Sequence, residues 1–306
     1  MKPWLPLFFA SIASVVTVAA CGARTGLRVD ETRAEPVDAG PDVEGPDAPN
    51  VVTPDCEEAG VSYIYLISSE NELLRFYPPD LSITTIGTLE CPLNAPGAPF
   101  SMAVNRQGIA FVLFSSGELF RVSTLTGVCT ATEFVSNPAI FPANFGMGFS
   151  ANKNDPGESL FVAGVTSNDP GATSRLGLIN TENFAMAIGA PLSQDIGSPE
   201  LTGTGDSRLF AFGPATTSNP DSHLAEIDKG TSAVLSDEIL DLQQTAISAW
   251  AFAFWGGDFY IFTSEQQGTS VIHRYTPGGT TTPPLVKQID GLTIVGAGVS
   301  TCAPSE

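Results

Sequence analysis

The chain has 306 residues and a formal net charge of −20, with 13 Lys and Arg against 33 Asp and Glu. Residues 56–306, numerous enough to build one sizeable core, hold 9 of the basic and 25 of the acidic side chains. Nucleic acid and anionic lipid both require clustered positive charge, so this composition argues against either as a direct partner.

The first 21 residues have the pattern of an export signal. A single Lys2 precedes an apolar stretch, residues 4–18, that is too short to span a bilayer as a stable anchor. Two alanines and Cys21 close the stretch. This ending resembles the bacterial lipobox, whose cysteine is diacylated and becomes the new N-terminus. We therefore predict a signal peptide over residues 1–20 and a lipid on Cys21.

Residues 21–55 have the composition of a disordered tether. They contain no aromatic residue, are rich in Pro, Gly and acidic side chains, and show no periodicity. Such a segment buries too little apolar surface to offset its ordering entropy. Gly22 stands where an aspartate would signal inner-membrane retention in other bacteria. We therefore expect the outer membrane, with membrane contact through the lipid only.

Residues 56–306 contain a repeat of about 50 residues. Five short segments share a small residue at their centre, and the centres lie 45, 55, 50 and 45 residues apart: Ala103, Gly148, Gly203, Ala253 and Gly298. Three further strands, divided by Gly, Asn, Asp or Pro turns, follow each of the first four segments. Four short strands per unit with hardly any helical period are typical of β-propeller blades. Small residues suit innermost strands, because these approach one another most closely.

The two ends of this segment complement each other. Residues 62–67, 73–77 and 83–89 match the second, third and fourth strands of a blade that has no first strand, whereas residues 294–300 match a first strand that nothing follows. If the C-terminal strand completes the N-terminal blade, the ring has no exposed edge at its seam. We therefore predict an all-β fold, a propeller of five four-stranded antiparallel blades closed by strand exchange, with six or seven blades as the alternative.

Four cysteines remain beyond Cys21, and none forms a CxxC pair. An even number in an exported chain favours disulfides over metal thiolates. Ring closure brings Cys302 close to Cys56, and a disulfide there removes on the order of 4 to 5 kcal/mol of loop-closure entropy from the unfolded chain. By elimination Cys91 pairs with Cys129, although simple blade geometry places these two strand ends on opposite faces of the ring.

Two parts of the chain resemble a known group of proteins. Residues 21–27 at the lipidated end, and residues 250–260 together with 295–302, are similar to envelope lipoproteins of myxobacteria. The resemblance covers the mature chain, and the block at residues 250–260 is fairly specific. It implies an exported lipoprotein with a propeller domain and brings no activity with it.

The sequence offers little catalytic chemistry. His223 and His273 have no Cys or carboxylate at metal-ligand spacing, and serine-hydrolase and nucleotide-binding motifs are absent. The sharpest enzyme hypothesis is a glycosidase, since several five-bladed propellers are glycosidases, with two carboxyl groups about 5 to 10 Å apart. Glu200, just before an inner strand, is the best candidate, whereas Asp206 and Asp258 fall in turns. We expect no enzyme activity, no cofactor and no metal.

Polar loops indicate a binding surface on one face of the propeller. The loops between second and third strands open beside the entries to the inner strands, and in this chain they concentrate amide and carboxylate groups near an indole. The candidate binding residues are Asn168, Asp169, Asn219, Asp221, Glu265 and Trp250. Two simpler interpretations stay open. The loops are polar because they are exposed to solvent, and Trp250 is a residue of the hydrophobic core.

Together these patterns predict a monomeric, lipid-anchored envelope protein that acts as a binding or scaffolding module. Its ligand would be a protein, a peptide or a carbohydrate. The alternative function is a carbohydrate-active enzyme of the glycosidase-like five-bladed type.

Overall fold

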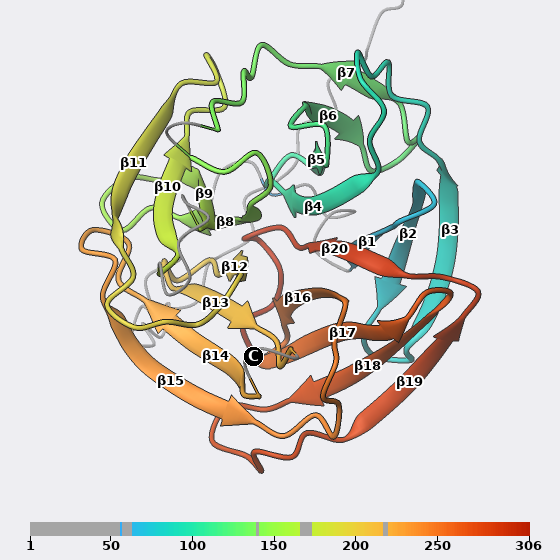
Figure 1. Ribbon diagram of the computed structural model, residues 1–306, viewed down its shortest axis with the longest axis vertical. Coiled ribbons are helices and arrows are strands. Elements are labelled where there is room, and N and C mark those ends of the chain that lie inside the picture. Colours follow the sequence, from blue (N-terminus) through green and yellow to red (C-terminus); the bar gives the residue numbers. More distant parts are fainter. Residues whose placement is uncertain (1–55, 57–62, 139–140, 166–172, 217–219) are drawn as a thin grey trace, which may run out of the picture. The chain divides into compact units, whose positions relative to one another are not determined.

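The structure is a computed structural model that describes residue 56 and residues 63–138, 141–165, 173–216 and 220–306. The predicted signal peptide (1–20), Cys21 and the predicted tether (21–55) lie outside the described residues. Within the described ranges the fold is all-β, and no helix occurs that could cross a membrane. Five four-stranded antiparallel sheets stand as blades around a central axis (Figure 1). The predicted five-bladed propeller is confirmed, and the alternative of six or seven blades is wrong.

Within each blade the four strands follow one another outward from the axis. Blade 1 consists of β20 (Ile294–Gly298), β1 (Ile64–Ser68), β2 (Glu72–Tyr77) and β3 (Ser82–Thr88). Blade 2 consists of β4 (Pro99–Val104), β5 (Ile109–Phe114), β6 (Leu119–Ser123) and β7 (Cys129–Ala131). Blade 3 consists of β8 (Gly146–Ala151), β9 (Glu158–Gly164), β10 (Arg175–Ile179) and β11 (Met186–Pro191). Blade 4 consists of β12 (Glu200–Gly203), β13 (Leu209–Gly213), β14 (Ser222–Ile227) and β15 (Val234–Leu240). Blade 5 consists of β16 (Ala249–Trp255), β17 (Asp258–Gln266), β18 (Thr269–Tyr275) and β19 (Leu285–Asp290).

Neighbouring innermost strands run parallel and touch through their backbones. A methyl group on Gly148 in β8 would lie 2.7 Å from the carbonyl carbon of Leu201 in β12. A methyl group on Gly298 in β20 would lie 2.9 Å from the backbone nitrogen of Val104 in β4. These distances leave no room for a side chain. The small residues of the repeat are therefore required by the approach of one blade to the next. We call the face where the innermost strands begin the entry face, and the face where they end the exit face.

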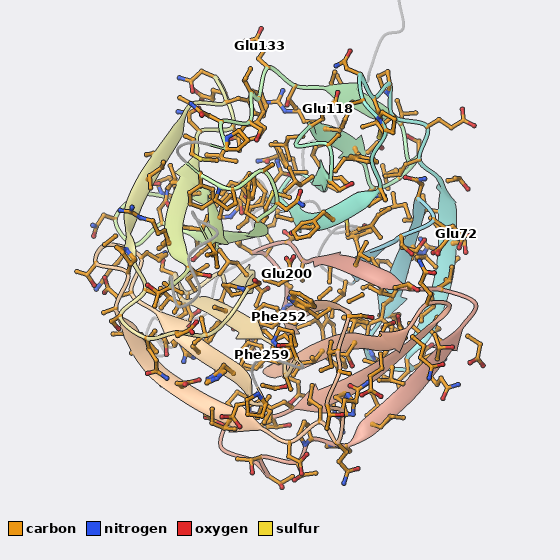
Figure 2. All side chains as sticks on the ribbon, viewed as in Figure 1. Glu72, Glu118, Glu133, Glu200, Phe252 and Phe259 are labelled. Atoms are coloured by element: carbon orange, nitrogen blue, oxygen red, sulfur yellow. A yellow bond between two sulfur atoms is a disulfide. The ribbon has the colours of Figure 1, made fainter. Side chains whose placement is uncertain are left out.

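Aromatic side chains fill the wider gaps farther from the axis. Between blades 4 and 5, Phe210, Phe252 and Phe259 belong to one buried cluster. The rings of Phe210 and Phe259 are packed edge to face, with 4.8 Å between their centroids. Phe252 and Phe259 are labelled in Figure 2. Burying one such side chain contributes roughly 1.5 to 3 kcal/mol. Neighbouring blades are wedge-shaped. They are therefore in contact through small residues near the axis and through large side chains farther out.

The C-terminal strand closes the ring. β20 pairs antiparallel with β1, with Leu66 opposite Ala297, and so becomes the innermost strand of blade 1. A disulfide joins Cys56 to Cys302, with 5.8 Å between their Cα atoms. The predicted strand exchange and the predicted disulfide at the seam are both confirmed.

The second disulfide joins Cys91, beyond the end of β3, to Cys129, the first residue of β7. The geometric objection to this pair fails because strands in a sheet twist, so that the outermost strands turn toward the circumference of the ring. In Figure 1, β3 runs along the outside of the ring and ends near β7. The end of one outer strand therefore meets the start of the next, and the predicted pairing is confirmed.

The segment after β20 covers the exit face. Thr301 Oγ1 accepts a hydrogen bond of 2.8 Å from Arg106 Nε of blade 2 and donates one of 2.7 Å to Glu158 Oε2 of blade 3. Gly256 of blade 5 donates its N–H to the carbonyl oxygen of Pro304 at 2.7 Å. The C-terminal segment thus lies across the exit face, where it is bonded to blades 2, 3 and 5.

The contact between innermost strands makes a direct prediction about stability. Gly148→Ala is expected to lower the free energy of unfolding by about 1 to 3 kcal/mol, because the added methyl overlaps the backbone of Leu201. Gly87→Ala in β3 is the matched control, since nothing lies within 4 Å of its added methyl. Urea unfolding of the two variants measures the difference, and equal stabilities would contradict the close approach.

Candidate functional site

One position of the repeat lines the entry to the axis in all five blades. It lies three residues before each central small residue and is occupied by Phe100, Phe145, Glu200, Trp250 and Val295. We call these five residues the entry ring. Each lies within, or directly before, an innermost strand. The fivefold arrangement of blades therefore brings Phe100, Glu200, Trp250 and Val295 together on the entry face, whereas the ring of Phe145 is buried against Phe134 and Phe141.

Two hollows open at the entry ring, and both are lined by Phe100, Glu200 and Trp250. The first has a volume of about 130 Å³ and reaches Val295, and the second has a volume of about 320 Å³ and reaches Phe145. Figure 2 shows Glu200 near the centre of the ring. Among the described residues that line the two hollows, Glu200 is the sole ionisable side chain.

Glu200 is the first residue of β12, whereas the sequence prediction placed it just before the strand. Only 4% of its surface is exposed. Its Oε2 accepts hydrogen bonds from Ser101 Oγ at 2.7 Å and from the Met147 backbone nitrogen at 3.4 Å. Burial raises the pKa of the Glu200 carboxyl well above its usual value, because these two neutral donors do not offset the loss of hydration. Burial therefore favours the neutral form of Glu200 relative to an exposed carboxyl group.

The second carboxyl oxygen, Glu200 Oε1, is the one available to a ligand. No described residue donates a hydrogen bond to it, and it does not belong to the fully enclosed polar atoms without a partner in the described part of the chain. Because Glu200 lines both hollows, Oε1 is the candidate atom for contact with a ligand.

Trp250 is the second residue of β16 and is partly buried. Its Nε1 donates a hydrogen bond of 3.1 Å to the carbonyl oxygen of Ser198, which lies in the connection leading into β12. This bond fixes the indole while leaving part of it accessible in both hollows. The predicted position of Trp250 at an inner-strand entry agrees with the structure. The side chain is neither fully buried, as a core residue would be, nor fully exposed, as a residue of the rim would be.

The other predicted binding residues are less informative. Asn168, Asp169 and Asn219 lie outside the described residues. Asp221 is exposed. Glu265 is also exposed, and its carboxylate accepts the backbone N–H groups of the connection between blades 4 and 5, at 3.0 Å from Thr245 and 3.3 Å from Ala246. Its hydrogen bonds therefore hold a loop.

Sequence reasoning missed Phe100, Phe145 and Val295 as partners of Trp250. The signal was present, because all of them occupy the repeat position that also holds Glu200. Aligning the five segments and reading the column three places before the centre finds the entire entry ring. For this fold a repeat position is more informative than the composition of the loops.

The two histidines do not form a metal centre. His223 Nδ1 lies 2.9 Å from the carboxylate of Asp237 on blade 4. His273 is buried in blade 5, its Nδ1 has no hydrogen-bond partner among the described residues, and burial lowers its pKa. No group of three or more His, Cys, Asp or Glu side chains in the described ranges is arranged to hold a metal ion.

No protein-family model and no curated protein sequence matches the chain. Among solved structures, the chain is similar to Bacteroides ovatus Xyloglucan PUL GH43B, at 15% sequence identity and a TM-score of 0.47. The likeness covers 62% of this chain and 42% of that one, so the chain spans less than half the length of that protein. At this identity and score it carries no argument about activity.

The state of Glu200 makes a prediction about pH. Because its folded pKa lies above the ordinary value of 4.5, the native state keeps a proton that the unfolded chain releases. The contribution of this group to the free energy of unfolding is therefore full below about pH 4.5 and is lost as the pH rises through the folded pKa. Glu200→Gln removes that loss, since an amide stays neutral.

Urea unfolding at a series of pH values from 4 to 9 measures the effect as the difference between wild type and Glu200→Gln. The variant is expected to gain stability relative to wild type as the pH rises. Parallel pH profiles would mean that Glu200 titrates normally.

Proposed function

We propose that the protein is a lipid-anchored propeller of the cell envelope that binds a ligand at its entry ring. The observation that carries the proposal is the pair of hollows shared by Phe100, Glu200 and Trp250. A site lined mainly by apolar and aromatic side chains, with one well-placed polar group, has the usual composition of a ligand pocket. A protein, a peptide or a carbohydrate remains the proposed class of natural ligand.

The proposed anchor rests on the sequence. Residues 4–18, the two alanines that follow and Cys21 have the order of a lipoprotein signal, and residues 21–27 are similar to the mature start of myxobacterial envelope lipoproteins. Gly22 supports the outer membrane as the destination. The acidic tether and the net charge of −20 fit a protein held at the membrane by lipid and not by basic patches.

A carbohydrate-active enzyme is the second candidate, and Glu200 is the observation that favours it. A buried carboxyl group with a raised pKa is suited to act as a general acid. Glycoside hydrolysis requires a second carboxyl group about 5 to 10 Å away. None of the other described residues that line the hollows carries one. Binding is therefore the better supported function.

The anchor is tested by Cys21→Ser. The serine variant cannot be diacylated at this position, so it is expected to lose partitioning into detergent and to leave the membrane fraction. Fractionation of cell envelopes, with a blot for the mature protein, measures both properties. A processed Cys21→Ser protein that still sediments with membranes would show that something other than this lipid holds it.

The binding site is tested by Trp250→Ala, with Trp255→Ala at the exit-face end of β16 as the matched control. Trp250→Ala is expected to abolish retention of the envelope ligand while lowering the free energy of unfolding by less than the roughly 3 to 5 kcal/mol typical of a core aromatic. Trp255→Ala is expected to retain the ligand. Binding of fractionated envelope extract to the immobilised full-length protein, combined with urea unfolding, measures both quantities.

Three outcomes of that experiment would contradict the proposed site. Retention unchanged in Trp250→Ala would exclude the indole from the site. Loss of retention in both variants would assign the effect to blade 5 as a whole. Global unfolding of Trp250→Ala would make Trp250 a core residue.

A further inference from the structure

The composition of the entry ring points to the charge of the ligand. Its five side chains come from five different blades, and they comprise three aromatic rings, one valine and one carboxyl group. The sole ionisable group among the described lining residues is acidic. A ligand that fills the hollows therefore meets aromatic rings and Glu200.

Glu200 has no cationic partner among the residues that the structure describes. Its hydrogen-bond donors are the hydroxyl of Ser101 and the backbone N–H of Met147, both neutral. No Lys, Arg or His occurs among the described residues that line the hollows. A carboxyl group that is 4% exposed can ionise at low cost only when a positive charge comes beside it. The site is therefore complementary to a cation.

The aromatic residues suit an organic cation better than a metal ion. The Nε1 of Trp250 is already bonded to Ser198, so the hydrogen-bonding edge of the indole is occupied while part of the ring stays accessible. Trp and Phe rings attract alkylammonium groups through their negative faces. Calcium and magnesium instead need six or more oxygen ligands, or several waters besides carboxylates. Among the described lining residues, one carboxyl group cannot supply a site of that kind.

We propose that the entry ring binds an organic ammonium ion, held between the rings of Trp250 and Phe100 with its charge beside Glu200 Oε1. The inference rests on the proposed function, in which these hollows are the binding site, and adds the chemical class of the ligand. An ammonium group on a peptide, a modified sugar or a small molecule would satisfy it equally.

Binding is coupled to release of a proton. Burial raises the pKa of Glu200 in the free protein, and a cation beside Oε1 stabilises the ionised form and lowers that pKa. Affinity therefore rises with pH, by up to tenfold per pH unit while the free protein still holds the proton.

No neighbouring strand offers another group to account for such a pH dependence. β4, β8, β13, β16 and β20 carry no titratable residue. Glu158, at the start of β9, lies on the exit face and is bonded to Arg106 and Thr301. Among the described strands packed against β12, the coupling is thus assigned to Glu200.

The test compares choline with 3,3-dimethyl-1-butanol, a neutral molecule of the same shape in which carbon replaces the ammonium nitrogen. Calorimetric titration of the full-length protein is expected to give at least tenfold tighter binding of choline at pH 8. Choline binding is expected to weaken at least tenfold at pH 5. Glu200→Gln is expected to remove both effects, while Glu133→Gln, an exposed carboxyl group at the outside of the ring (Figure 2), keeps them.

The outcomes separate the two levels of the inference. Equal binding of choline and the alcohol would overturn the cationic ligand and leave the hollows as an apolar binding site. Choline binding that is unchanged in Glu200→Gln or independent of pH would also overturn it. If neither probe binds, the ammonium class is excluded. The proposed function is then tested separately, by whether the wild type retains the envelope ligand and Trp250→Ala loses it.

Discussion

Backbone contact between parallel innermost strands is the constraint on which the rest of the propeller depends. At Gly148 and Gly298, two central positions of the repeat, the neighbouring strand comes so close that a methyl group would overlap its backbone. The central column of the repeat holds only small residues, glycine in blades 1, 3 and 4 and alanine in blades 2 and 5, and aromatic side chains fill the gaps between blades. Glycine weakens an isolated strand, so the burial of residues such as Phe210 and Phe259 must offset that loss.

The same constraint decides where a ligand site can form. The entry ring lies three residues before the central column, at or directly before the start of each innermost strand. The opposite end is spanned by the C-terminal segment, tied down through Thr301 to Arg106 and Glu158. The hollows at Phe100, Glu200 and Trp250 are therefore sites with one accessible side. Glu200 lines these hollows and is buried, and this burial raises its pKa.

Much of this fold was predictable, because the repeat and the incomplete blades at both ends are properties of the sequence itself. Strand exchange and the Cys56–Cys302 disulfide follow from them. The Cys91–Cys129 pair was predicted only by elimination, since it depends on the twist of outer strands, which no pattern of residues states. The site was harder. Trp250 and Glu200 were each singled out, but for opposing hypotheses, and their meeting at one entry ring depends on the register between blades. The low exposure of Glu200 and its neutral partners also come from three blades at once, so no local pattern contains them.

The exchange of the last strand also decides when the propeller can fold. β1 obtains its inner neighbour only from residues 294–298, and the disulfide that seals this pairing joins cysteines 246 residues apart. Until those residues exist, the first blade presents an unpaired strand edge, which is a template for association with other chains. Contacts between such distant segments also form slowly. Blade 1 and the ring can therefore close only after residues 294–298 have been synthesised, whereas each of blades 2 to 5 consists of strands that are contiguous in the sequence.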